Sequence, residues 1–369
     1  MNRVLAVALS LVAAASFAEE PPTLKSLMPP GVRIGAAVNQ RVSDAVEAPD
    51  RTLVLTQFDS ITPENLLKWE VVHPEPGRYE FGPADRYVEM GSSAGLFVVG
   101  HALVWHQQTP KWVFEGQDGK RADRETLLAR MREHIRAVAG RYRGKVHGWD
   151  VVNEAFEDDG TLRKTGWSEI IGPDFIEKAF EFAREAAPEA ELYYNDYNLW
   201  KPAKREAAER LVESLKAKGI RIDAVGEQAH YHVTGPSVEE IERVITALAA
   251  RGVKVMLTEL DIDVLPSHPD MWGADLSKKS EIKAATNIYP NGLPSEEQAK
   301  LAARYGDLFR LVKKHSDVVS RVTFWGVTDR TSWLNNFPIP GRVNYPLLFD
   351  RDGKAKPAFD AVVAVLRDR

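Results

Sequence analysis

Two glutamates, Glu154 in WDVVNEAF and Glu259 in KVMLTELD, follow short apolar runs that are typical of buried strands. Two carboxyl groups that face each other can hydrolyse a glycosidic bond. One protonates the leaving oxygen, and the other attacks the sugar or activates a water molecule. Either glutamate alone is consistent with a solvated strand end, but the pair, with tryptophans and histidines nearby, favours a catalytic role.

Three tryptophans, Trp105, Trp325 and Trp333, lie among polar residues that follow strand-like runs. Sugar rings have apolar faces that pack on flat aromatic side chains, so we expect these three to line a carbohydrate site. The tryptophans that we expect in the core are Trp112, Trp149, Trp167 and Trp200.

His230 and Asp261 lie close to the ends of two of these runs. A buried imidazole held by Asp261 could hydrogen-bond Glu259 and keep that carboxylate oriented and ionised. The alternative is a core histidine whose ring nitrogens are satisfied elsewhere.

Motifs for common metals, cofactors and nucleophiles are absent from the sequence. It has no cysteine, no His-x-x-x-His pair, no phosphate-binding loop and no serine nucleophile motif. We therefore expect a reaction that uses no metal ion and no cofactor.

The elements that must position these residues alternate between strands and helices. The strands are predicted at 34–39, 57–64, 96–105, 146–154, 191–198, 224–231, 254–261 and 321–329. Helical patterns cover 124–142, 173–188, 202–219, 237–252, 295–315 and 357–368, with less clear connections at 43–57 and 83–94. This alternation predicts an α/β fold, a single-domain (β/α)8 TIM barrel, whose strands bring their C-terminal ends to one mouth. An open doubly wound sheet is the alternative, but no Gly-x-Gly-x-x-Gly follows a strand.

The N-terminus differs in composition from the rest of the 369 residues. Arg3, an apolar run and the small residues Ser16 and Ala18 predict a signal peptide at 1–18, followed by a catalytic domain at 19–369. We therefore expect a secreted or periplasmic protein that has no membrane span and is a monomer. The net charge of −5, with no strongly basic segment, argues against a nucleic-acid partner.

One connection, 262–294, is unusually long and follows the seventh predicted strand. Long loops in compact domains are often functional, so it could shape the site on the leaving-group side. Its carboxylates, which include Asp270 and Asp275, could also bind calcium, although scattered aspartates are usually only solvated.

Seven motifs in this order make the chain similar to a known family. They are FDSITPENLLKWE (58–70), GHALVWHQQTPKW (100–112), WDVVNEAF (149–156), YYNDYN (193–198), GEQAHY (226–231), LTELDI (257–262) and FWGVTDRTSWL (324–334). From about Leu27 to the C-terminus the chain resembles glycoside hydrolase family 10, the endo-β-1,4-xylanases.

The resemblance implies a role for each matching position. Glu154 matches the acid/base, and Glu259 matches the nucleophile of a retaining mechanism. Residues implied to bind the sugar chain on its non-reducing side are Glu64, Asn65, Lys68, His101, Trp105 and Gln108. Those implied at the point of cleavage are Asn153, which bonds a 2-hydroxyl, Gln228 and His230 as partners of the nucleophile and sugar, and Trp325 and Trp333 as wall and roof. Asn195 and Tyr197 are expected on the leaving-group side.

The implied activity is endo-acting hydrolysis of internal β-1,4 bonds of xylan or xylo-oligosaccharides by double displacement. The alternatives are a β-1,4-glucanase on a similar barrel and a non-catalytic glycan-binding protein. A roof of Trp325 and Trp333 would crowd the hydroxymethyl group that glucose has and xylose lacks. Ala229 departs from the glycine of many family members, which we expect to leave His230 in place.

Overall fold

Parallel strands form a closed barrel in the computed structural model, which describes residues 22–116, 118–267, 274, 275 and 287–368. The strands are β1 (Arg33–Val38), β2 (Ser60–Pro63), β3 (Phe97–Gly100), β4 (Gly148–Asn153), β5 (Glu191–Asp196), β6 (Ala224–Glu227), β7 (His230–His232), β8 (Lys254–Asp263) and β9 (Val319–Phe324). They pair in the order β6-β5-β4-β3-β2-β1-β9-β8-β7, and a further pairing of β6 with β8 closes the ring. The predicted (β/α)8 barrel is confirmed.

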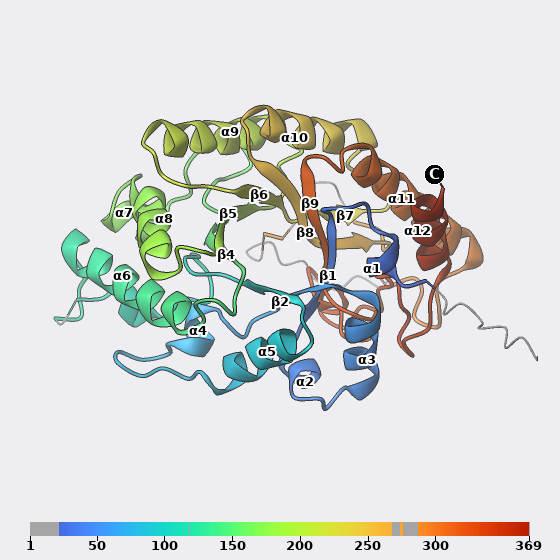
Figure 1. Cartoon of the computed structure of the whole chain (residues 1–369), viewed down its shortest axis with the longest axis horizontal. Helices are drawn as coiled ribbons and strands as arrows, with labels where there is room; N and C mark the ends of the chain where they lie inside the picture. Colours follow the sequence, from blue (N-terminus) through green and yellow to red (C-terminus); the bar gives the residue numbers. More distant parts are fainter. Residues whose placement is uncertain (1–21, 117, 268–273, 276–286, 369) are drawn as a thin grey trace, which may run out of the picture.

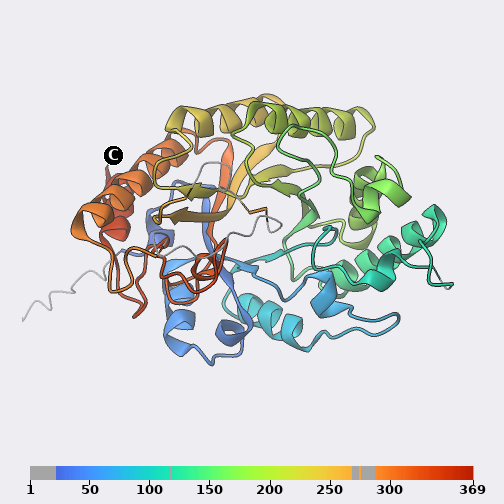
Figure 2. The same ribbon diagram turned by 180° about the vertical axis from the view of Figure 1, so that it is seen from behind.

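Helices surround the barrel, as Figure 1 shows. The longer ones are α3 (Ala48–Gln57), α5 (Gly82–Ser93), α6 (Arg124–Arg141), α8 (Phe175–Ala186), α9 (Pro202–Ala217), α10 (Val238–Ala250), α11 (Ser295–Lys314) and α12 (Pro357–Arg367). Short helical segments are α1 (Leu24–Leu27), α2 (Gln40–Ser43), α4 (Trp69–Val72), α7 (Gly166–Ile170) and the 3₁₀ turns η1 (Lys111–Phe114) and η4 (Trp333–Asn335). Seen from behind, the segment that follows β9 lies across one end of the barrel (Figure 2).

Several predicted strands differ in extent from the observed ones; the third ends at Gly100 and not at 105, and the last ends at Phe324 and not at 329. Two further differences have a clear backbone cause. The sixth is broken into β6 and β7, because Ala229 adopts a left-handed conformation with φ 64° and cannot continue a ladder. The second begins later than predicted, since Gln57 ends α3 and the Phe58 amide still bonds the Val54 carbonyl. The two unclear connections contain α3 and α5.

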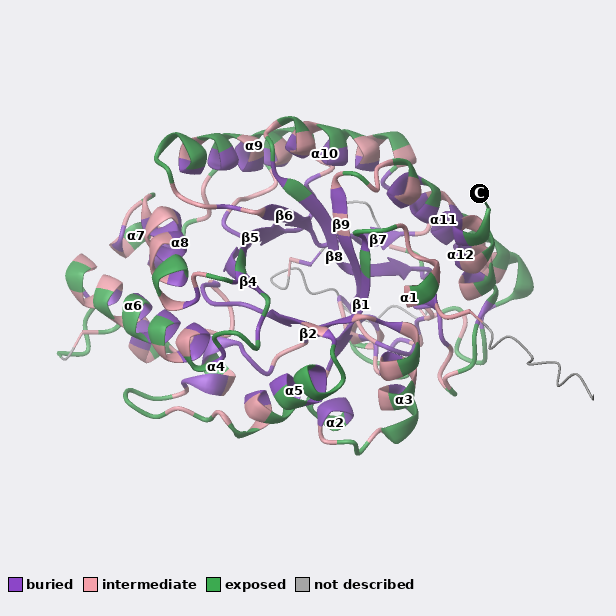
Figure 3. Cartoon of the chain, viewed as in Figure 1, coloured by how far each residue is buried: buried purple, intermediate pink, exposed green. Residues whose placement is uncertain are grey.

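The core lies inside the barrel and between the barrel and its helices, and the outer helix faces are exposed (Figure 3). Trp149 and Trp167 are buried, and Trp112 and Trp200 pack against the core, as predicted. Gly100 is required beside Trp149, because a Cβ there would lie 2.1 Å from the indole ring.

In the described part of the chain, no helix has both the length and the apolar character needed to cross a membrane. The predicted signal peptide at 1–18 lies outside the described residues.

Candidate active site

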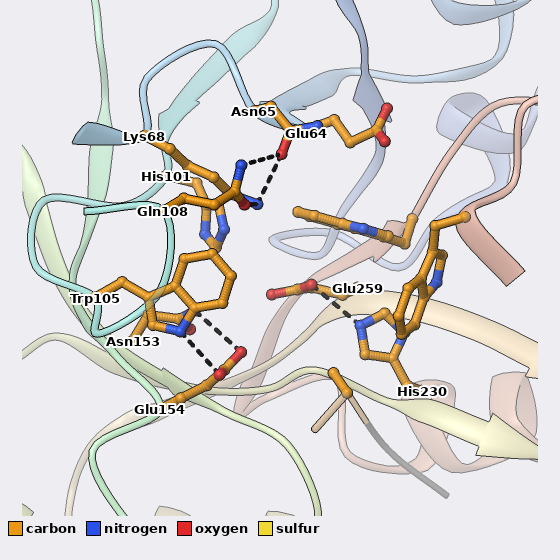
Figure 4. A pocket seen from close by; sticks show the side chains of 13 residues that line it. Glu64, Asn65, Lys68, His101, Trp105, Gln108, Asn153, Glu154, His230 and Glu259 are labelled. Atoms are coloured by element: carbon orange, nitrogen blue, oxygen red, sulfur yellow. Dashed lines mark hydrogen bonds and ion pairs between the residues drawn. The ribbon is translucent and has the colours of Figure 1, made fainter. Parts of the chain in front are cut away.

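A cleft opens at the C-terminal ends of the strands and brings together most of the predicted site residues (Figure 4). The described residues that line it are Glu64, Asn65, Lys68, His101, Trp105, Gln108, Asn153, Glu154, His230, Glu259, Ala274, Trp325 and Trp333. Four predicted residues, Asn195, Tyr197, Gln228 and Asp261, lie behind this lining. The carboxyl groups of Glu154 and Glu259 point into the same part of the cleft.

Glu154 follows β4, and among the described residues its carboxyl group accepts hydrogen bonds from neutral donors. Its Oε2 accepts from Trp105 Nε1 at 2.8 Å, and its Oε1 accepts from Gln228 Nε2 at 2.9 Å and Asn153 Nδ2 at 3.2 Å. Burial raises the pKa of Glu154, and the negative charges of Asp196 and Glu259 raise it further against these hydrogen bonds. Glu154 is therefore suited to hold a proton and donate it.

Glu259, on β8, is equally buried but has a cationic partner. Its Oε2 lies 3.1 Å from His230 Nε2, and its Oε1 accepts from Asn195 Nδ2 at 2.7 Å. Burial alone would raise the pKa of Glu259, but the His230 hydrogen bond, the nearby His101 and Asn195 together lower it. Glu259 is therefore suited to remain ionised and act as a nucleophile.

His230 is held between two carboxylates. Its Nδ1 lies 3.0 Å from Asp261 Oδ1, and the other oxygen of Asp261 accepts from Trp333 Nε1 at 2.7 Å. Burial opposes protonation of the ring, but Asp261 and Glu259 outweigh it and raise the pKa of His230 to about 10. An imidazolium donates from both nitrogens, so this arrangement orients Glu259 as the sequence predicted.

The opposite part of the cleft carries a polar cluster around Lys68. Its ammonium group donates to Asn65 Oδ1 at 3.0 Å and Gln108 Oε1 at 2.9 Å, and it lies 4.7 Å from the centre of the Trp105 ring. Burial raises the pKa of the neighbouring Glu64. Amide, ammonium and carboxyl groups beside an indole can bind the hydroxyls and the apolar face of one sugar.

Asp150 is the single acidic residue inside the apolar run of β4, and its partner explains its presence there. It lies 2.9 Å from His101 Nδ1, and both side chains are buried. Asp150 therefore fixes the ring of a histidine that lines the cleft.

Asn195 was assigned to the leaving-group side, and the structure corrects this. Its side chain is fully buried and bridges Glu259 and Asn153, donating to Asn153 Oδ1 at 2.9 Å. Gln228 contacts the acid Glu154, while only its backbone carbonyl bonds the Glu259 amide. Asn195 and Gln228 are both amides at strand ends. The sequence therefore indicates that they lie near the site but does not indicate which groups they contact.

Tyr197 is buried behind the cleft lining. Its hydroxyl accepts from Arg163 Nη2 at 2.9 Å, and its ring lies under the Lys204 ammonium group at 3.5 Å. In the 262–294 connection, Ala274 lines the cleft, whereas Asp270 lies outside the described residues. Within the described ranges, no group of three or more His, Asp or Glu side chains is placed to hold a metal ion.

A parallel barrel whose cleft presents two buried glutamates, one with a raised and one with a lowered pKa, is typical of a glycoside hydrolase. The sequence profile of glycosyl hydrolase family 10 matches residues 24–365, and the chain belongs to this family. It is 43% identical to Endo-1,4-beta-xylanase A of Xylanibacter ruminicola over 96% of each chain. It is also 43% identical to an Endo-1,4-beta-xylanase of Geobacillus stearothermophilus, over 93% of this chain and 98% of the relative.

Solved structures agree with these relatives. A family 10 endoxylanase retrieved from a sugarcane soil metagenome superposes with a TM-score of 0.89 at 44% identity, over 94% of this chain and 99% of that one. Xylanase XynB from Paenibacillus barcinonensis, complexed with a conduramine derivative, gives a TM-score of 0.85 at 37% identity, over 94% and 99% of the two chains.

Proposed function

We propose that this protein is a retaining endo-1,4-β-xylanase that cleaves internal bonds of xylan. The observation that carries the proposal is the contrast between Glu154 and Glu259, two buried carboxyls in one cleft. Burial raises the pKa of Glu154 against its neutral hydrogen-bond donors, whereas His230, His101 and Asn195 lower the pKa of Glu259 in spite of burial. The family membership and the xylanase names of the relatives support the same activity.

In the first step, Glu259 attacks the anomeric carbon while Glu154 protonates the departing sugar oxygen. In the second step, Glu154 removes a proton from water, which then displaces Glu259 from the sugar with net retention of configuration. Asn153 is expected to bind the 2-hydroxyl of the attacked sugar. Trp325 and Trp333 are expected to enclose that sugar, and Lys68 and its neighbours to hold the next one.

The activity is tested by release of reducing ends from xylan and from carboxymethylcellulose. We expect hydrolysis of xylan, and none of it after Glu154→Ala or Glu259→Ala. Proton NMR of the first products should show the β anomer before mutarotation. Absence of xylan hydrolysis by the wild-type protein, or an initial α product, would refute the proposal.

The domain limits, cellular location and oligomeric state belong to the same proposal. An apolar run followed by Ser16 and Ala18 supports a signal peptide at 1–18 and export to the periplasm or the medium. Mass spectrometry of the protein recovered from the producing cells should give an N-terminus near Glu19. Light scattering should give the mass of a monomer.

A further inference from the structure

The backbone of Glu154 adopts an unfavourable conformation that its surroundings must hold. Its φ is 58°, in the left-handed region that a residue with a Cβ rarely enters. Three hydrogen bonds fix the turn. The Glu154 amide donates to the Asn195 carbonyl at 2.9 Å, Arg163 Nε donates to the Glu154 carbonyl at 3.2 Å, and the Ala155 amide donates to the Tyr194 hydroxyl at 3.1 Å.

The Tyr194 hydroxyl can accept from Ala155 only if its own proton points elsewhere. That proton is donated to Asp196 Oδ2. An ionised carboxylate has no proton to give, so Asp196 fixes the direction of the hydroxyl and leaves a lone pair free for Ala155. Tyr194 and Asp196 both lie on β5, beside β4, which Glu154 directly follows.

The charge on Asp196 is balanced by Lys204 of α9, whose ammonium group lies 2.8 Å from Asp196 Oδ1. Both side chains are 0% exposed, so neither charge is solvated, and a second carboxylate, Asp158, lies farther from the ammonium group, at 3.6 Å. Lys204 also lies over the ring of Tyr197, whose hydroxyl accepts from Arg163. The two side chains that hydrogen-bond the Glu154 turn, Tyr194 and Arg163, are therefore both connected to this ion pair, Tyr194 through Asp196 and Arg163 through Tyr197.

We propose that Tyr194, oriented by the Asp196–Lys204 ion pair, is a positioning residue that aims the carboxyl of Glu154 at the leaving oxygen. None of these three side chains lines the cleft among the described residues, so the Tyr194 hydroxyl acts through the Glu154 turn, whereas Asp196 also acts on Glu154 through its charge. The inference rests on the proposed role of Glu154 as acid/base.

The test is Tyr194→Phe in the full chain, with two substrates that differ in their need for the acid. Xylopentaose has a poor leaving group, a sugar hydroxyl, whose oxygen must be protonated. The dinitrophenolate of dinitrophenyl β-xylobioside departs without protonation. We expect kcat/KM for xylopentaose to fall about tenfold and that for the aryl glycoside to change less than about twofold, since a small misplacement of one catalytic group affects only the step that uses it.

Tyr87→Phe is the matched control, because it removes another buried hydroxyl, one that donates to the carbonyls of Ile61 and Val99. It should leave the ratio of the two kcat/KM values unchanged. Asp196→Asn is the second variant, which keeps the Tyr194 ring and hydroxyl but frees the hydroxyl direction, and it should shift the ratio in the same sense as Tyr194→Phe.

Equal losses on both substrates, or no loss on either, would overturn the inference, because a structural effect alone lowers the active fraction for every substrate. If Tyr194→Phe does not fold, the ratio for Asp196→Asn decides, measured at a pH well below the basic limb, where Glu154 holds its proton with or without the charge of Asp196. A wild-type protein inactive on both substrates would instead refute the proposed function.

Discussion

Asn195→Ala is expected to damage the nucleophile rather than the acid. Asn195 donates to Glu259 Oε1 at 2.7 Å and is itself fixed by Thr258 Oγ1, which donates to its Oδ1 at 2.5 Å. A hydrogen bond to a charged group contributes about 1.5–3 kcal/mol. If that contribution is lost in the transition state, kcat/KM should fall by about ten- to 150-fold.

The assay is kcat/KM for xylopentaose and for dinitrophenyl β-xylobioside. Both values should fall by a similar factor, because attack by Glu259 and departure of either leaving group occur in the same transition state. Asn344→Ala is a matched control: Asn344 is also 0% exposed and donates its amide to a carboxylate, Asp263, at 2.7 Å. A folded Asn195→Ala protein with kcat/KM within about threefold of wild type on both substrates would refute the reasoning.

Further predictions concern pH. The proposed mechanism requires Glu259 ionised and Glu154 protonated. Initial rates on xylan should therefore show kcat/KM lost as pH falls through the lowered pKa of Glu259 and as pH rises through the raised pKa of Glu154. Trp105→Phe removes a hydrogen bond that stabilises the ionised form of Glu154, and it should move the basic limb to higher pH, whereas an unchanged limb would contradict this assignment. Burial lowers the pKa of His73 to about 4 and that of His134 well below its ordinary value, so the free energy of unfolding should be full above pH 6.5 and fall as pH decreases toward these folded values. Urea unfolding at several pH values should show this loss. His134→Leu should make the free energy of unfolding depend less steeply on pH.

The barrel could be predicted because its signals are local. Apolar runs of strand length alternate with helical periodicity, and parallel strands joined this way close with their C-terminal ends together. This rule alone places Glu154 and Glu259 at one mouth. The limits of individual strands were less predictable, since the start of the second strand and the break in the sixth depend on backbone conformation at Phe58 and Ala229.

The partners of the polar side chains could not be predicted in the same way. Asn195 is next to Asp196 in the sequence, yet one supports the nucleophile and the other supports the acid through Tyr194. Neighbours on a strand point to opposite faces, so two adjacent polar residues can serve different groups. Which group each one serves depends on the twist and closure of the barrel, which no local pattern records.

The break at Ala229 accounts for the division of roles between the two glutamates. Burial does not distinguish them, because Glu154 is 3% exposed and Glu259 is 5% exposed. Their partners differ: Gln228, before the break, gives Glu154 a neutral amide, and His230, after it, gives Glu259 a cation. In an unbroken strand, residues two apart lie on one face at a fixed spacing, whereas the left-handed turn at Ala229 allows these two to reach different carboxyls.

That difference has a direct electrostatic consequence. A neutral donor leaves the cost of burying a charge on Glu154 largely in place, so this carboxyl retains its proton at a pH where an exposed glutamate would lose it. His230, kept cationic by Asp261, offsets the same cost for Glu259. The different pKa shifts of the proposed acid and nucleophile therefore depend on the charge of one neighbour on each side of a single strand break, neutral Gln228 and cationic His230. His230→Gln should reduce the difference between the two pKa values even where a hydrogen bond to Glu259 is kept.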